Sequence, residues 1–142
     1  MKAGFIAIVG RPNVGKSTLL NRILGEKVAI VSPRAQTTRH RIKGILTRKD
    51  AQLVFVDTPG IHKPHHLLGQ NLVKAAEEAL GDSDVRLFLV DGSEKAGKGD
   101  EWVADLLKGK NPTLLVVNKS DRPGATTEEI LASYRALGFG DA

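Results

Sequence analysis

Residues 10–17, GRPNVGKS, directly follow an apolar run at residues 5–9 and decide the fold of this chain. The pattern GxxxxGK[ST] is typical of a phosphate-binding loop, in which glycines let successive backbone N–H groups face a phosphate chain. Lys16 adds a positive charge to the loop, and Ser17 offers a hydroxyl that can bind Mg²⁺. Apolar residues then recur at helical spacing over residues 16–24, so this helix should pack back on its sheet. We therefore predict a nucleoside-phosphate site at the first strand.

A second apolar run, residues 113–117, ends in Asn118, Lys119, Ser120 and Asp121, which match the guanine motif NKxD. The Asp121 carboxylate can accept two hydrogen bonds from the N1–H and the amine of guanine, whereas adenine would leave it unpaired. We expect Asn118 to bond the base edge and tether the loops, and the alkyl stem of Lys119 to cover the flat face of the base. NKxD alone is also an ordinary polar turn, but together with the upstream motif it favours GTP.

A third motif, DTPG at residues 57–60, follows an apolar strand predicted over residues 53–56 and matches DxxG. Asp57 would lie in the outer coordination shell of the metal, and the N–H of Gly60 would approach the γ-phosphate. The same residue types also make an ordinary strand-terminating turn. Three motifs in this order outweigh that alternative.

The segment between the first and third motifs, residues 32–45 (SPRAQTTRHRIKGI), is the candidate first switch. A threonine there would bring its hydroxyl to Mg²⁺ and its N–H to the γ-phosphate, and both contacts would vanish after hydrolysis. Thr38 is favoured for this role over Thr37, and the choice between them stays open.

Taken together, GRPNVGKSTLLN, AQTTRHRIKGI, FVDTPGIHKP and VVNKSD resemble the Era family of bacterial GTPases, over residues 4–121. The same group includes Der and the tRNA-modifying MnmE, and the stretches QTTRHR and DTPGIHKP favour Era over both. The resemblance implies a cytoplasmic GTP-hydrolysing switch in small ribosomal subunit assembly, with 16S rRNA as partner and peripheral membrane association of the full-length protein. It also implies an SA-containing guanine loop and a C-terminal RNA-binding KH domain, which this sequence does not contain. We expect one Era-type G domain over residues 1–142 that stops before its last strand and helix.

The motifs and the resemblance together assign the site residues. The residues expected to bind the nucleotide are Asn13, Val14, Gly15, Lys16, Ser17, Thr18, Asp57, Gly60, Asn118, Lys119 and Asp121. Those expected to hold Mg²⁺ are Ser17, Thr38 and Asp57. Those expected to take part in hydrolysis are Lys16, Thr38, Gly60 and Asn13. In relatives such as MnmE, the asparagine that matches Asn13 helps to hold a potassium ion, so hydrolysis is expected to be stimulated by potassium. Ile61 stands where many GTPases carry a water-orienting glutamine and cannot position water by hydrogen bonding. His62 either turns inward or is merely exposed.

Apolar strands alternate with helical patterns, which predicts an α/β fold, a P-loop NTPase G domain with a mostly parallel sheet and helices on both faces. Strands are expected over residues 5–9, 42–48, 53–56, 87–90 and 114–117, and helices over residues 16–24, 67–80, 100–107 and 127–137. Only residues 49–50 separate the second strand from the third, too few for a crossover helix. This pair should therefore be antiparallel and lie at one edge.

Composition limits the possible classes of protein. The 142 residues, 41% of them hydrophobic, suffice for one domain with a sizeable core. The absence of cysteine excludes disulfides and thiolate metal sites. No apolar stretch approaches the roughly 20 residues that span a bilayer, and the N-terminus has no signal-peptide pattern.

The net charge of +5 and the pI of about 9.6 raise an alternative function, an RNA-binding fragment with a vestigial nucleotide site. The basic residues of this candidate patch are Arg34, Arg39, His40, Arg41, Lys43, Arg48 and Lys49. A run of charges is usually a solvated face, and aromatic residues make up only 4% of the chain, too few for interleaved base stacking. The other alternative is the G domain of a Der-like or MnmE-like GTPase, although Der usually repeats the whole G domain and this chain contains one.

Overall fold

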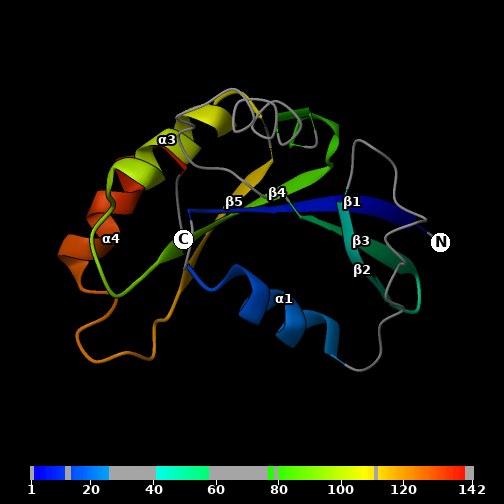
Figure 1. Ribbon diagram of the computed structural model, residues 1–142, viewed down its shortest axis with the longest axis horizontal. Helices are drawn as coiled ribbons and strands as arrows, with labels where there is room; N and C mark the ends of the chain where they lie inside the picture. The colour runs from blue at the N-terminus through cyan, green and yellow to red at the C-terminus, as the bar shows by residue number, and fades with distance from the viewer. Residues whose placement is uncertain are drawn as a thin grey trace.

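The computed structural model contains one sheet with the strand order β2-β3-β1-β4-β5 (Figure 1). The structure describes residues 2–11, 14–25, 41–57, 77–78, 80–110 and 112–139, with the backbone alone at residues 41–43 and 57. The strands are β1 (Lys2–Val9), β2 (Arg41–Thr47), β3 (Ala51–Asp57), β4 (Val85–Asp91) and β5 (Thr113–Asn118). The helices are α1 (Lys16–Leu24), α3 (Lys98–Leu107) and α4 (Glu128–Arg135), and residues 77–78 and 80–82 are also helical.

The pairing of the strands confirms a mostly parallel sheet. β1 pairs in parallel with β3 and β4, and β4 pairs in parallel with β5. β2 runs antiparallel to β3, as the short connection predicted. β2 ends at Thr47 instead of Arg48 because Arg48 already belongs to the turn, where its N–H donates to Ala51 O at 2.8 Å. Among the described residues β5 forms the opposite edge, and its Leu114 is 55% exposed.

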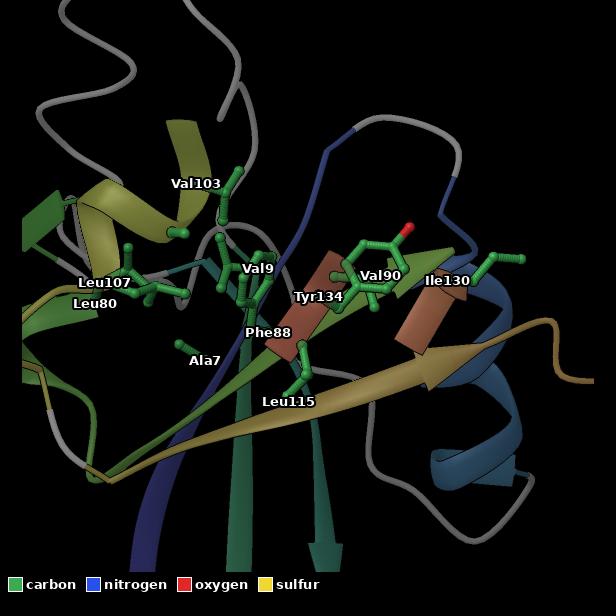
Figure 2. Packing of buried hydrophobic residues seen from close by; sticks show 11 residues of the cluster. Ala7, Val9, Leu80, Phe88, Val90, Val103, Leu107, Leu115, Ile130 and Tyr134 are labelled. Atoms are coloured by element: carbon green, nitrogen blue, oxygen red, sulfur yellow. The ribbon is translucent and has the colours of Figure 1, made fainter. Parts of the chain in front are cut away.

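Helices cover both faces of the sheet because successive residues of a buried strand point to opposite sides. Ala7 and Val9 belong to the larger hydrophobic cluster, which α3 and α4 complete, whereas Ile8 joins Leu20 of α1 and Phe55 in a smaller one. Figure 1 shows α1 on one side of the sheet and α3 and α4 on the other. Figure 2 shows the larger cluster, with Ala7, Val9, Leu80, Phe88, Val90, Val103, Leu107, Leu115, Ile130 and Tyr134 labelled.

β4 begins at Val85, two residues before its expected start, because a buried arginine interrupts the apolar pattern there. The Arg86 guanidinium donates to the carbonyl oxygens of Leu80 at 2.7 Å, Ser83 at 2.7 Å and Pro112 at 3.3 Å. These hydrogen bonds make it possible to bury a charged side chain that is only 5% exposed. They also join the two segments that enter β4 and β5.

The helices differ from expectation at their ends. α4 starts at Glu128 because the preceding Thr127 is its N-cap, and Thr127 Oγ1 accepts from Ile130 N–H at 3.3 Å. It ends at Arg135 and not at residue 137. The helix expected over residues 67–80 falls largely outside the described residues. No helix in the described part of the chain is both long and apolar enough to cross a bilayer.

The carboxyl ends of the parallel strands meet at one rim of the sheet. Register places Asp57 opposite Ile8 near the end of β1, and Asp91 opposite Asn118 at the ends of β4 and β5. In open α/β sheets this rim binds the ligand, because the loops that follow the strands converge there. The three motifs predicted from the sequence begin at this rim.

Candidate nucleotide-binding site

Two glycines of the first motif allow close backbone packing. Gly15 has φ of +96°, a conformation that side chains other than glycine rarely adopt. A Cβ atom at Gly15 would lie 2.2 Å from Asn118 Nδ2, and one at Gly10 would lie 2.6 Å from Leu89 O. The motif therefore needs glycine at both positions, one against the guanine loop and one against β4.

The N-terminus of α1 is suited to an anion. Its first turn contains Lys16, Ser17 and Thr18 with no acidic residue, and the N-cap Gly15 supplies no side-chain hydrogen bond to the turn. N–H groups at such a helix start, together with the helix dipole, favour a phosphate group. The structure thus brings the predicted phosphate-binding residues of this turn into a suitable arrangement.

The guanine motif is tied directly to the phosphate loop. Asn118 Nδ2 donates to Val14 O at 2.9 Å, which confirms the expected tether between residues 104 positions apart. Beside this bond lies a cavity of about 570 Å³. Its lining residues are Gly15, Thr18, Leu19, Arg22, Asn118, Lys119, Asp121 and Arg122. The predicted residues Gly15, Thr18, Asn118, Lys119 and Asp121 therefore share one pocket.

Asp91, which sequence analysis missed, lies between the two loops. Its Oδ1 accepts from Ser93 N–H at 2.9 Å and from Ser93 Oγ at 2.5 Å, and its Oδ2 accepts from Lys119 Nζ at 3.0 Å. Burial opposes the charge on Asp91, but the Ser93 hydrogen bonds and Lys119 outweigh it and lower the pKa of Asp91 to about 2. The one signal in the sequence was its position at the end of an apolar strand, as for Asp57 and Asn118.

Arg11, the second residue of the first motif, was also missed. Its Nε donates to Asp100 Oδ2 at 3.1 Å, its Nη2 pairs with Glu94, and Nη2 lies 4.0 Å from Asp91 Oδ2. Burial opposes the charge on Arg11, but Asp100 and Glu94 outweigh it and raise the pKa of Arg11. Asp100 is fully buried, and within the described residues its Oδ1 has no hydrogen-bond partner. These contacts connect the phosphate loop to α3.

Tyr134 of α4 supports the loop after β4 from the core side. Its buried hydroxyl lies 2.6 Å from Asp91 O and 2.8 Å from Glu94 O and donates to these carbonyls. Burial, followed by the negative charge of Asp100, raises the pKa of Tyr134 to about 12. A core side chain thus positions the backbone that carries Asp91.

Several predicted site residues cannot be placed. Asn13, Thr37, Thr38, Gly60 and His62 lie outside the described residues. No cluster of three or more metal-binding side chains occurs among the residues that the structure describes. The oxygen donors that remain for Mg²⁺ are the Ser17 hydroxyl, in the anion-favouring turn of α1, and the Asp57 carboxylate, whose backbone lies beside the end of β1. One direct ligand from Ser17 and an outer-shell group from Asp57 fit Mg²⁺, which usually keeps several waters and is held by few protein groups together with phosphates.

The described basic residues of the candidate RNA patch are spread along β2 and the turn that follows it. Arg41 starts β2 and Arg48 follows its end, so an extended strand separates them by roughly 23 Å. Arg48 and Lys49 are exposed in the turn at the rim opposite the phosphate loop. The strand thus spreads these neighbouring residues along its length, and the RNA-binding alternative stays a prediction. Arg34, Arg39 and His40 lie outside the described residues.

Comparisons with known proteins agree with this geometry. The family described as 50S ribosome-binding GTPase matches residues 5–119. Over 137 residues the chain is 56% identical to the GTPase Era of Nostoc sp. and 55% identical to that of Crocosphaera subtropica. Each match covers 96% of this chain but only 42% and 44% of those proteins, so the chain spans less than half the length of these relatives.

Solved structures show the same relationship. A variant of Aquifex aeolicus Era bound to GDP and AlF4⁻ is 43% identical with a TM-score of 0.73. An Era complex with MgGDPNP and nucleotides 1506–1542 of 16S ribosomal RNA is 42% identical with the same TM-score, 0.73. Each covers 96% of this chain and 47% of the solved one. These likenesses confirm the predicted G-domain fold and the resemblance to Era.

Proposed function

Since the chain belongs to the 50S ribosome-binding GTPase family, we propose that it binds GTP and GDP and acts as a slowly hydrolysing molecular switch. One observation carries this proposal: the Asn118 side chain donates to Val14 O, so that the phosphate loop and the guanine loop border a single pocket. A nucleotide would place its base near Asp121 and its phosphates at the start of α1. By analogy with unassisted GTPases, intrinsic turnover would be roughly 10⁻⁴ to 10⁻² s⁻¹.

Base choice would depend on Asp121. This residue lines the pocket beside Lys119 and is exposed to an incoming ligand. Its carboxylate would accept hydrogen bonds from the N1–H and the amine of guanine. Adenine presents no matching pair of donors there, so it would leave the carboxylate desolvated and unpaired.

Phosphate binding would depend on the first turn of α1. The backbone N–H groups there and the Lys16 charge would hold the phosphate oxygens, and Ser17 and Asp57 would hold Mg²⁺, Asp57 from the outer shell. When bound, Mg²⁺ would neutralise charge on the β- and γ-phosphates. Gly60 and Thr38 would contact the γ-phosphate through their backbone N–H groups, so their contacts would distinguish GTP from GDP. This assignment rests on their place in the sequence motifs.

Ile61 stands where many GTPases carry a water-orienting glutamine, so the attacking water needs another positioning group. Hydrolysis also needs a positive charge at the phosphates, which an arginine finger supplies in other GTPases. The resemblance to relatives such as MnmE, in which the matching asparagine helps to hold a potassium ion, supports a potassium ion held with the help of Asn13. Arg11 does not take this part, because Asp100, Glu94 and Asp91 surround its guanidinium with negative charge. Hydrolysis would then be stimulated by potassium, with the attacking water positioned mainly by backbone groups.

The process served would be assembly of the small ribosomal subunit, with 16S rRNA as partner. Support comes from the identity to GTPase Era and from the likeness to an Era complex that contains 16S rRNA nucleotides. A cytoplasmic location and peripheral membrane association of the full-length protein remain predictions from the resemblance.

The test is a titration of fluorescent GDP onto nucleotide-free protein, competed with GDP, ADP and XDP. We expect competition by GDP and none by ADP. Asp121→Asn should shift preference toward XDP, because an amide donates where the carboxylate accepted. Asp105→Asn, which removes an exposed carboxylate from α3, is the matched control and should change nothing. A folded chain that binds no GDP, or an Asp121→Asn variant with intact guanine preference, would contradict the proposal.

A further inference from the structure

One carboxylate lies between cations from both loops of the nucleotide site. Asp91 Oδ2 is 3.0 Å from Lys119 Nζ of the guanine motif and 4.0 Å from Arg11 Nη2 of the phosphate loop. Its other oxygen, Oδ1, is taken by the two donors of Ser93. Asp91 is only 5% exposed, so these contacts form in a site with little competing water.

Lys119 has an unusual conformation for a residue with a side chain. Its φ is +60°, and a non-glycine residue in the left-handed region persists only where its surroundings hold it there. The backbone on one side is held by Gly92 N–H, which donates to Asn118 O at 2.7 Å. Asp91 holds the other end of the residue through the ammonium group. The Lys119 side chain is therefore fixed at both ends while it lines the guanine pocket.

The backbone of Asp91 is itself held by contacts from the core side. The Tyr134 hydroxyl contacts Asp91 O at 2.6 Å, so a fully buried core residue anchors the backbone at the end of β4. Thr126 N–H donates to Gly92 O at 2.9 Å and joins this loop to the segment after the guanine motif. Asp91 is thus a rigid point against which a flexible lysine can be oriented.

We propose that Asp91 is a positioning residue for base binding: it orients Lys119 so that the lysine stem forms one wall of the guanine pocket before a nucleotide arrives. The inference rests on the proposed function. A free lysine side chain loses considerable rotamer entropy when it is ordered. Because Asp91 has already ordered the stem, the entropy loss does not occur on nucleotide binding, and the affinity for the nucleotide is higher.

Base selectivity separates this role from that of Asp121. The alkyl stem of Lys119 covers the flat face of a purine and does not distinguish its edge groups. Loss of Asp91 should therefore weaken GDP and IDP by the same factor, whereas Asp121 acts on the edge and changes the ratio between them. A variant that had merely lost structure would not combine an unchanged ratio of GDP to IDP affinity with an effect that disappears when Lys119 is also replaced.

The test measures the Kd of GDP and IDP for Asp91→Asn, Lys119→Met and the double variant, with Asp105→Asn as the matched loss of an exposed carboxylate. Lys119→Met keeps an apolar stem and removes the ammonium. We expect each single variant to weaken GDP binding about tenfold, through faster dissociation, with the GDP to IDP ratio unchanged. The double variant should be no weaker than either single one, because both remove the same contact.

Several outcomes would overturn the inference. They are an Asp91→Asn affinity within twofold of wild type, effects that multiply in the double variant, or a changed GDP to IDP ratio. If Asp91→Asn fails to fold by circular dichroism, Lys119→Met and Asp91→Glu provide the same test, because Glu keeps the charge and should bind more tightly than Lys119→Met. Failure of the wild-type chain to bind GDP would refute the proposed function instead, so the two failures are distinguishable.

Discussion

Tyr134→Phe removes one hydroxyl and leaves the aromatic ring in the core, so it isolates the support that Tyr134 gives to the loop after β4 (Figure 2). The lost contacts are those to Asp91 O at 2.6 Å and Glu94 O at 2.8 Å. Asp91 O keeps a weak backbone bond from Glu94 N–H at 3.5 Å, whereas Glu94 O, among the described residues, has the hydroxyl as its partner. We therefore expect a loss of about 1–2 kcal/mol in the free energy of unfolding.

The measurement is urea denaturation of the nucleotide-free protein, followed by circular dichroism. In a thermal melt of a chain of this length, the expected loss of stability would lower the Tm by about 3–7 °C. Thr47→Val is the control, since the Thr47 hydroxyl is exposed and its contact with Gln52 Nε2 is long, at 3.5 Å. The control should change stability by less than about 0.5 kcal/mol.

The raised pKa of Tyr134 also predicts how the stability contribution of its hydroxyl changes at alkaline pH. Tyr134 is the one tyrosine of the chain, so the ultraviolet absorbance of tyrosinate reports its pKa alone. The folded pKa, about 12, is above the ordinary value of 10.0. The stabilisation from the hydroxyl is therefore complete below pH 10 and is lost as the pH rises toward 12, because the unfolded chain ionises first. The stability difference between wild type and Tyr134→Phe should narrow over that range.

Two results would refute this reasoning. The first is a tyrosine that titrates near 10 in the folded protein, since the burial argument requires a higher pKa. The second is a Tyr134→Phe variant as stable as wild type at neutral pH. Either result would mean that the hydroxyl does not support the backbone of Asp91.

Two further predictions concern the phosphate loop. Gly15→Ala should abolish GDP binding in the titration and lower stability by about 2 kcal/mol or more, because the new Cβ would meet Asn118 Nδ2 at 2.2 Å and adopt a positive φ. Gly81→Ala, with no atom within 4 Å of its Cβ, should be tolerated, and equal losses in both variants would contradict the argument. GTP hydrolysis should be faster in potassium than in sodium, and Asn13→Ala should remove the difference; equal rates in wild type would exclude a potassium role.

Much of the fold and the site followed from local patterns in the sequence. A phosphate loop is one contiguous stretch whose glycines and lysine have fixed spacing, and its place between a strand and a helix is visible from the apolar periodicity. The antiparallel pairing of β2 and β3 could also be predicted from local sequence, because the short turn at residues 48–50 allows no other connection. The guanine motif and its tether to the loop also followed, once the two motifs were assigned to one rim.

The sequence by itself therefore determined the class of fold, and it predicted the ligand class and the residues proposed to contact the nucleotide. The tertiary structure alone decided which side chains hold those residues in place. Asp91 meets Lys119 across 28 positions, and Arg11 meets Asp100 across 89. No periodicity or motif links such pairs, because their contact depends on which strand ends lie side by side in the sheet and on which helix packs beneath them.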